Sequence, residues 1–390
     1  RLAARPSVPM RLRDLPTPCL VLDLARLKRN VARMRDRARE LGVVLRPHLK
    51  TAKSVDVALL VHGGVPGPIT VSTLAEAEHF AAAGFADILY AVGIVPAKLA
   101  RVASLMARAP ALKIILDDLE TARAVAAQGH ALGCRFNVAI EIDTGGGRAG
   151  IAADDPALLE IGADLNNAGM LAGVMAHAGH SYGCKSLDEI VAVAEAERAG
   201  VVRAAERLRG AGHTVGLVSV GSTPTALHAR HLDGVGEMRP GNFVFFDLFQ
   251  HGLGMCAADD LAVSVLSSVI GHHKARNHVL LDAGALALSK DVGANAVTPQ
   301  IGYGLVRAPA EAAPRADVAV LDVHQEHGIV SARTGLDAIA PLPFGDFGIG
   351  DRLLVLPNHV CMTAAMHDRY YVVDGLDDTV VAEWPRIAGW

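Results

Sequence analysis

Short apolar segments alternate with amphipathic ones over the first two thirds of the chain. Eight segments rich in Val, Ile and Leu predict strands, at residues 43–50, 69–73, 87–92, 113–116, 136–142, 171–177, 215–220 and 234–239. Helical periodicity lies between most of them, at 54–61, 96–108, 119–132, 156–167 and 187–208. Eight strands with intervening helices predict an α/β fold, a (β/α)8 TIM-like barrel. A doubly wound open sheet is the alternative, but no GxGxxG motif follows an early strand.

The pattern changes near residue 256. Short strand-like segments separated by Gly and Pro follow, at 262–270, 277–282, 317–324, 352–356, 370–373 and 380–384, without a long amphipathic helix. They predict an all-β C-terminal domain. We therefore expect a barrel domain at 17–256 and a β domain at 257–390 that also includes the N-terminal segment 1–16. The strand predicted at 19–22 could belong to either domain.

Composition narrows the classes of function. Hydrophobic residues make up 51% of the 390 positions and charged residues 20%, which excludes a disordered chain. No run of 18 apolar residues occurs, so no membrane span is expected. The net charge of −4 and 4% aromatic content make nucleic acid a poor partner. Five scattered cysteines indicate a reducing compartment. We expect the cytoplasm, with organelle import left open because the native N-terminus is not visible.

Small and polar residues gather where the predicted strands end. In a barrel, the C-terminal ends of the strands carry the active site. Glycines in the last two of these loops would let backbone N–H groups approach an anion, as in the usual phosphate site of barrels. The predicted phosphate-binding residues are Gly221, Ser222, Thr223, Gly241 and Asn242. Two ordinary turns are the alternative interpretation.

Lys50 stands at the end of the first apolar strand. Partial desolvation there would lower its pKa and favour the neutral amine that forms a Schiff base. A surface lysine is the alternative. Together with a phosphate site across the barrel mouth, Lys50 indicates an aldehyde cofactor that bears a phosphate, and pyridoxal 5'-phosphate fits that description.

His359 and Cys361 form the second candidate centre. If they lie on a strand, residues two apart point to the same side, so an imidazole and a thiolate could bind one metal ion. Two protein ligands would leave positions open for substrate or water. A core cysteine beside a surface histidine is the alternative.

Five motifs, taken together and in this order, carry a resemblance. They are Arg-Pro-His-Leu-Lys-Thr at 46–51, Ile-Glu-Ile-Asp at 140–143 with Arg148, Val-Gly-Ser-Thr-Pro-Thr at 220–225, Gln-Glu-His-Gly at 325–328 and Pro-Asn-His-Val-Cys at 357–361. From about residue 16 to the end, the chain resembles the fold-type III pyridoxal phosphate enzymes of the D-serine dehydratase, D-threo-3-hydroxyaspartate dehydratase and D-threonine aldolase family.

The resemblance implies a role for each candidate residue. Lys50 would link to the cofactor, Arg148 would meet its phenolate side, His177 would lie against the pyridine ring and Tyr182 near the ring nitrogen. His359 and Cys361 would bind a divalent metal, usually zinc, with Mn, Mg or Co as alternatives. The substrate would be a small D-amino acid. Members of this fold type are generally homodimers in which each active site lies between a barrel and a neighbouring β domain.

Two residues bear on which bond the enzyme breaks. Related aldolases often have Asp where this chain has Cys361, and the dehydratases have His-x-Cys. The resemblance therefore favours a dehydratase that turns a D-β-hydroxy-α-amino acid into a 2-oxo acid and ammonia. His180 could be the additional base that retro-aldol cleavage to glycine and an aldehyde requires, so a D-threonine aldolase stays open. A racemase and a non-catalytic pyridoxal phosphate-binding protein are further alternatives.

Overall fold

The computed structural model describes residues 10–333 and 341–390 and divides the chain into two units. The barrel unit comprises Ala32–Gly241 with the last two residues, and the β unit comprises the chain up to Val31 and Asn242–Ala388. Residues of the predicted 17–256 domain that lie outside Ala32–Gly241 thus belong to the β unit. In the described part of the chain, no helix has the length and apolar character to cross a membrane.

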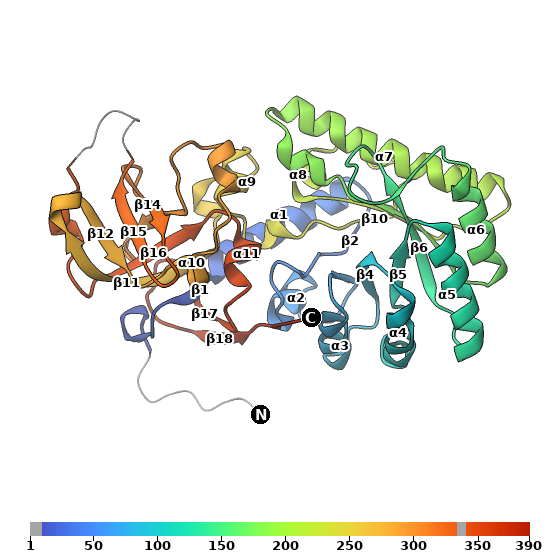
Figure 1. The fold of residues 1–390 in the computed structure, drawn as a ribbon, viewed down its shortest axis with the longest axis horizontal. Helices are drawn as coiled ribbons and strands as arrows, with labels where there is room; N and C mark the ends of the chain where they lie inside the picture. Colours follow the sequence, from blue (N-terminus) through green and yellow to red (C-terminus); the bar gives the residue numbers. More distant parts are fainter. Residues whose placement is uncertain (1–9, 334–340) are drawn as a thin grey trace. The chain divides into compact units, whose positions relative to one another are not determined.

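The barrel unit is built on a parallel sheet, which confirms the predicted fold (Figure 1). The sheet order is β2-β10-β9-β8-β6-β5-β4-β3. These strands are β2 (Val44–Leu45), β3 (Ile69–Val71), β4 (Ile88–Gly93), β5 (Lys113–Leu116), β6 (Asn137–Asp143), β8 (Leu171–Ala176), β9 (Leu217–Val220) and β10 (Glu237–Met238), with β7 (Ile151–Ala152) paired to β6. An isolated parallel bridge between His48 and Thr70 joins the chain after β2 to β3 and brings the two ends of the sheet together.

The first and last barrel strands are much shorter than predicted. The predictions at 43–50 and 234–239 are wrong in length, because β2 and β10 have two residues each. Pro47 and Pro240 follow these strands closely. Since proline has no N–H to donate to a ladder, each strand gives way to loop just where the chemistry of the site begins.

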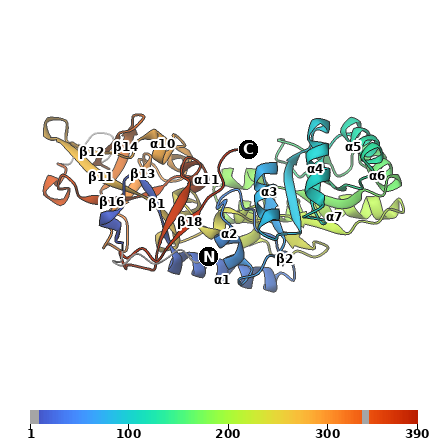
Figure 2. The same ribbon diagram turned by 90° about the horizontal axis from the view of Figure 1, so that it is seen from below.

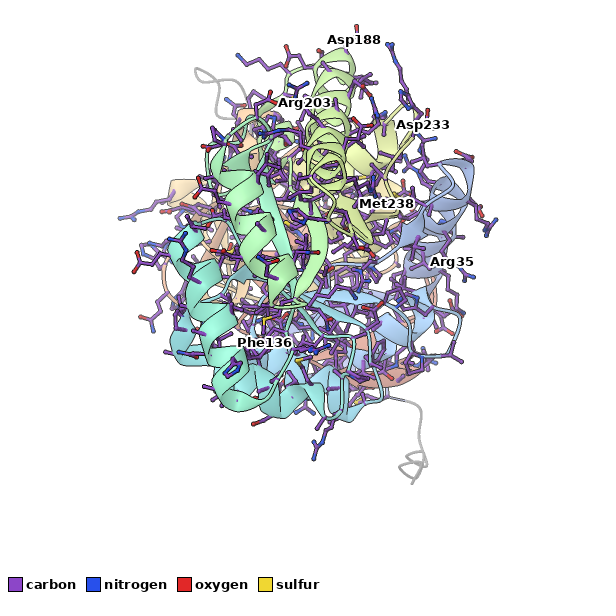
Figure 3. All side chains as sticks on the ribbon, turned by 90° about the vertical axis from the view of Figure 1, so that its right-hand side faces the viewer. Arg35, Phe136, Asp188, Arg203, Asp233 and Met238 are labelled. Atoms are coloured by element: carbon purple, nitrogen blue, oxygen red, sulfur yellow. The ribbon has the colours of Figure 1, made fainter. Side chains whose placement is uncertain are left out.

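Helices cover the outside of the barrel strands (Figures 1 and 2). They are α2 (Val55–Val61), α3 (Leu74–Ala82), α4 (Leu99–Met106), α5 (Leu119–Leu132), α6 (Ala157–Asn167), α7 (Leu187–Gly210) and α8 (Thr223–His228), while α1 (Leu24–Glu40) precedes β2. The Thr73 hydroxyl accepts the Glu76 N–H at 3.0 Å and caps α3. Figure 3 shows Asp188 and Arg203 on the outer, solvated side of α7.

The barrel interior is filled by a layer of side chains from neighbouring strands. Leu89, Ile115, Ala139, Met175 and Leu217 form this buried cluster, and each comes from a different strand. Such a layer makes the barrel a packed core rather than a pore. Ligands must therefore bind at the strand ends above it.

The β unit contains an antiparallel barrel. Its sheet order is β12-β15-β14-β13-β16-β11-β1-β17-β18, and an additional β12–β11 pairing closes the first six strands into a ring. The strands are β1 (Cys19–Asp23), β11 (Val263–His273), β12 (His278–Leu281), β13 (Gly304–Arg307), β14 (Val318–Val323), β15 (Gly328–Ala332), β16 (Arg352–Pro357), β17 (Arg369–Val373) and β18 (Ala382–Pro385). The strand predicted at 19–22 belongs here, because β1 pairs with β11 and β17.

Candidate cofactor pocket and metal-binding pair

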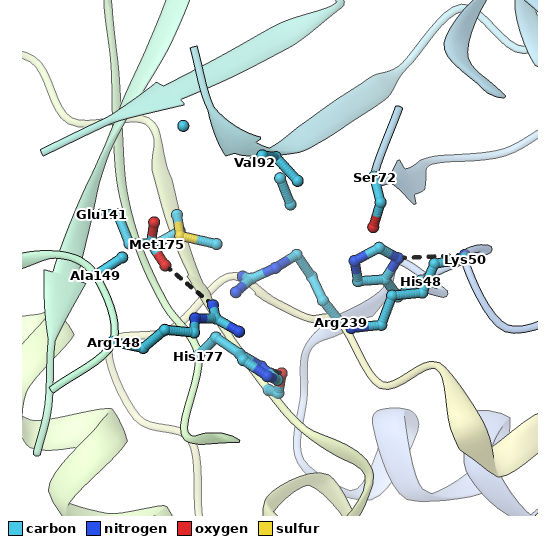
Figure 4. Close-up of a pocket in the computed structure, with 13 residues that line it drawn as sticks. His48, Lys50, Ser72, Val92, Glu141, Arg148, Ala149, Met175, His177 and Arg239 are labelled. Carbon is cyan, nitrogen blue, oxygen red and sulfur yellow. Dashed lines mark hydrogen bonds and ion pairs between the residues drawn. The ribbon is translucent and has the colours of Figure 1, made fainter. Parts of the chain in front are cut away.

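A cavity of about 310 Å³ lies at the C-terminal ends of the barrel strands. This volume falls in the range of small-molecule sites. Its lining comes from almost every strand end of the barrel, as the sequence predicted (Figure 4). The lining residues are His48, Lys50, Ser72, Ala91, Val92, Gly93, Glu141, Arg148, Ala149, Met175, His177, Gly221 and Arg239.

Lys50 follows β2 and lines this pocket (Figure 4). The side chain is exposed, so the expected partial desolvation of its amine is wrong for this structure. The reason is the open mouth of the pocket above the strand ends. Gly241 lies against the backbone just before Lys50, since a Cβ on Gly241 would lie 2.8 Å from the His48 carbonyl oxygen. Gly241 therefore allows two backbone segments to approach closely, which is a different reason for glycine from the predicted one.

Arg148 enters the pocket on the loop that follows β6. Its Nη2 lies 3.5 Å from Oε1 of Glu141 (Figure 4). Burial raises the pKa of Glu141, and the Arg148 cation opposes that rise. The loop is organised by Asp143, whose Oδ1 accepts the N–H groups of Gly145, Gly146 and Gly147 at 2.9–3.1 Å. No role was predicted for Asp143, although an Asp shortly before three glycines suits such a turn.

His177 follows β8, and its protonation state can be derived from its contacts. Burial lowers the pKa of His177 to about 3, so the ring is neutral at pH 7. Its Nδ1 lies 2.9 Å from the Gly221 carbonyl oxygen. A carbonyl can only accept, so Nδ1 carries the proton and Nε2 keeps a lone pair. The pocket thus contains an uncharged imidazole among several cations.

His48 and Arg239 are pocket residues to which the sequence analysis gave no role. Burial lowers the pKa of His48 well below its ordinary value. Arg239 is 3% exposed, donates to the Ser219 hydroxyl and the Ala176 carbonyl, and has its pKa lowered by burial. Their positions in the sequence could have identified them, because both lie at the ends of predicted barrel strands, where the active site of a barrel is expected.

Besides Gly241, which is described above, the four predicted phosphate-binding residues lie in three places. Gly221 lines the pocket, and Ser222 and Thr223 begin helix α8 directly after it. The Ser222 N–H donates to the Thr225 hydroxyl at 3.0 Å, and its own hydroxyl accepts the Thr225 N–H at 3.2 Å. Asn242 belongs to the β unit and donates its side-chain amide to Asp247 at 2.6 Å.

His180 and Tyr182 lie in a 3₁₀ turn at Gly179–Gly183. Neither is among the described residues that line the pocket. The ring of His180 instead packs beside Gly145 and Gly146, where a Cβ on Gly146 would lie 3.3 Å from Nδ1. Within the described part of the chain, this buried Nδ1 has no hydrogen-bond partner. The structure therefore places His180 against the glycine loop rather than in the cavity.

His359 and Cys361 do not share a strand, so the expected geometry is wrong. Strand β16 ends at Pro357, and His359 is the N-cap of helix α11 (Val360–Ala364). The two side chains nevertheless meet through a hydrogen bond. Nδ1 of His359 lies 2.7 Å from Oδ2 of Asp291. The imidazole and the thiol thus meet because a helix begins at this point, and not because they alternate along a strand.

Negative groups around His359 dominate its titration. Burial lowers its pKa, but Cys361, Asp247 and Asp291 outweigh burial and raise the pKa to about 10. A histidine with such partners is a fitting ligand for a cation. Among the described residues, no group of three or more His, Cys, Asp or Glu side chains could hold a metal ion. The assignment of His359 and Cys361 as two metal ligands stays a prediction.

Comparison with known families gives two matches along the chain. Residues 22–248 match the family model of the alanine racemase N-terminal domain. Residues 262–373 match that of a putative serine dehydratase domain. The matches cover the barrel and most of the β unit.

Characterised relatives match over nearly the whole chain. D-threo-3-hydroxyaspartate dehydratase of Delftia sp. is 46% identical over 97% of this chain and 99% of its own. D-serine dehydratase of Dictyostelium discoideum is 30% identical over 97% and 98%. A 3-hydroxy-D-aspartate aldolase of Paracoccus denitrificans is 30% identical over 95% and 92%.

Solved structures agree with these relatives. The Delftia dehydratase superposes with a TM-score of 0.93 over 97% of this chain and all of its own, at 46% identity. Two mutants of a D-threo-3-hydroxyaspartate dehydratase, both 45% identical, superpose with TM-scores of 0.93 and 0.94 over 98% of this chain, and over 100% and 97% of their own. One replaces a cysteine by alanine and is in a metal-free form, and the other replaces a histidine by alanine two positions earlier.

Proposed function

The chain belongs to the family of the alanine racemase N-terminal domain, and we propose that it is a pyridoxal phosphate- and metal-dependent dehydratase of D-β-hydroxy-α-amino acids. The family and the carbon–oxygen lyase activity predicted from the sequence are confirmed by the matches. The observation that carries the proposal is the 46% identity to D-threo-3-hydroxyaspartate dehydratase along both whole chains. That enzyme's substrate is accordingly the one proposed here.

The pocket residues fit pyridoxal phosphate. Lys50 offers an amine for its aldehyde, and Arg148 offers a cation for its phenolate. The neutral imidazole of His177 can lie against an aromatic ring without adding charge. Gly221, Ser222 and Thr223 directly follow strand β9, where barrels usually bind a phosphate group. When bound, this cofactor withdraws electrons from the substrate Cα.

The chain's own groups can handle the protons of a dehydration. Nζ of Lys50 would take the proton from Cα of the substrate. Arg148 would orient the cofactor while Glu141 holds its guanidinium at the rim of the pocket. The β-hydroxyl would leave, and the resulting enamine would hydrolyse to a 2-oxo acid and ammonia.

His359 and Cys361 would hold a divalent metal, with zinc favoured by the thiolate. Asp291 accepts the Nδ1–H of His359, which leaves Nε2 for the ion, as in carboxylate–histidine–zinc arrangements. The Cys and His mutants of D-threo-3-hydroxyaspartate dehydratase, two positions apart and one of them in a metal-free form, support this assignment because His359 and Cys361 have the same spacing. When bound, such a metal would act as a Lewis acid on the β-hydroxyl.

Retro-aldol cleavage is the second candidate, because aldolases are among the relatives. It requires a base for the β-hydroxyl proton, and His180, the proposed base, is not among the pocket residues. This placement favours dehydration.

We also propose, on the resemblance to the family, that the enzyme is a homodimer. The five scattered cysteines support the further proposal that it acts in the cytoplasm.

The substrate assignment can be tested by ammonia release from D-threo-3-hydroxyaspartate, D-serine and D-threonine, with the L-enantiomers as controls. We expect the highest kcat/KM with hydroxyaspartate, no turnover of L-enantiomers and loss of activity with EDTA. A higher kcat/KM with D-serine would transfer the assignment to the D-serine dehydratases.

A further inference from the structure

Helix α7 has a glutamate within its buried face. Ala194, Glu197 and Val201 follow one another at helical spacing on the side that packs against the barrel. Glu197 is only 1% exposed. A carboxylate in such a position is costly unless hydrogen bonds compensate for its lost hydration. The partners of Glu197 should therefore reveal what it does.

One oxygen of Glu197 connects two strand ends of the pocket. Its Oε1 accepts the Ala178 N–H at 2.8 Å and the Gly221 N–H at 3.0 Å. Ala178 directly follows His177 at the end of β8, and Gly221 directly follows β9. The carboxyl group of Glu197 thus links the segments after β8 and β9, both of which supply pocket residues.

Gly221 transmits this restraint to His177. The Gly221 carbonyl oxygen accepts the Nδ1–H of His177 at 2.9 Å, while its N–H is held by Glu197. Gly221 has φ +130°, and a Cβ there would lie 2.8 Å from the Arg239 nitrogen. The glycine is therefore packed against its neighbour and hydrogen-bonded through both its N–H and its carbonyl group, so its backbone links Glu197 to the His177 ring.

We propose that Glu197 is a positioning residue of the cofactor pocket. It sets the backbone of Ala178 and Gly221 and, through Gly221, the direction of the His177 imidazole. This inference rests on the proposed cofactor site and is independent of which bond the enzyme breaks. It concerns cofactor affinity, so its test needs no substrate.

Two substitutions at Glu197 separate the reach of the side chain from its carboxyl group. Glu197→Asp keeps the carboxyl group, but the shorter side chain cannot span both amides. We expect the dissociation constant of pyridoxal phosphate to rise about tenfold or more, the loss typical of a buried amide left without its acceptor. Glu197→Gln keeps the reach and replaces the carboxyl group by an amide whose oxygen can still accept both N–H groups, so the rise should be only about threefold. The absorbance maximum of the bound cofactor should shift in the same order.

The matched control is Glu206→Gln, which changes an exposed glutamate on the same helix and should leave affinity unchanged. Thermal unfolding of each cofactor-free variant separates stability from affinity. Unaltered affinity and absorbance in both Glu197 variants, with only a lowered unfolding temperature, would make Glu197 a structural residue and overturn the proposal. If Glu197→Asp does not fold, Glu197→Gln decides, because an affinity equal to that of Glu206→Gln would refute it.

Discussion

The barrel pocket and the His359–Cys361 pair reach their geometry in different ways. In the barrel, Lys50, Arg148, His177 and Gly221 come from separate strand ends and meet because parallel strands end on one face. In the β unit, His359 and Cys361 are neighbours in sequence and meet because a helix begins between them. Topology thus assembles the first site, and a local turn of backbone assembles the second.

This difference predicts that the two sites can be disabled separately, and the largest effect should come from Lys50. Lys50→Ala should abolish the visible absorbance of the purified protein and reduce turnover by at least about 10⁴-fold, since both the cofactor linkage and the Cα base are lost. Borohydride reduction and peptide mapping of the unaltered protein should place the cofactor on Lys50. A label on the neighbouring Lys53 instead would end the assignment.

Cys361→Ala should affect the other site alone. We expect loss of the bound metal and of turnover, with the cofactor absorbance retained because Lys50 and Arg148 belong to the barrel unit. Metal content by elemental analysis and the absorbance spectrum measure both properties in one sample. Full activity of this variant in the presence of chelator would contradict the metal assignment.

Asp291→Asn should have a smaller effect on the same site. The variant loses the carboxylate that accepts the Nδ1–H of His359, so metal affinity should fall about 10- to 100-fold. Competition with a chromophoric chelator would measure this. Exposed Asp322 of β14 provides the control, because Asp322→Asn should leave metal affinity unaltered. Equal affinities in the two variants would show that Asp291 does not orient the ligand.

His180→Asn should have the smallest effect. Because His180 packs beside the glycine loop outside the cavity, ammonia release should stay within about threefold of the unaltered enzyme, far from the 10²–10⁴-fold cost of removing a general base. Steady-state rates with D-threo-3-hydroxyaspartate test this. A loss of ammonia release in that larger range would give His180 a role in proton transfer during dehydration. The same loss in the release of glycine from D-threonine would favour the aldolase.

The sequence predicted the parts of the site that depend on pattern and order. Strand periodicity located the loops that carry Lys50, His177 and Arg239, because their positions follow from the fold class. Exposure of the Lys50 side chain and the placement of His180 depend on how loops pack, which periodicity does not encode. The strand assumed at His359 failed because the chain begins a helix two residues after β16, an outcome decided by the contacts of that segment.

Glu197 shows a signal that the sequence contained and pattern analysis missed. A glutamate within the apolar face of a long helix breaks the expected alternation of polar and apolar positions, and in the structure its Oε1 accepts the N–H groups of Ala178 and Gly221. A glutamate within the buried face of a helix is therefore a reason to look for backbone N–H groups that it accepts near an active site.

The central claim is that this chain breaks the Cβ–O bond of a D-β-hydroxy-α-amino acid. Mass-spectrometric analysis of the products from D-threo-3-hydroxyaspartate tests it most directly. Dehydration gives oxaloacetate and ammonia, and retro-aldol cleavage gives glycine and glyoxylate. We predict oxaloacetate and ammonia in equal amounts with little glycine. Glycine and glyoxylate as the main products would contradict the account and make the protein an aldolase.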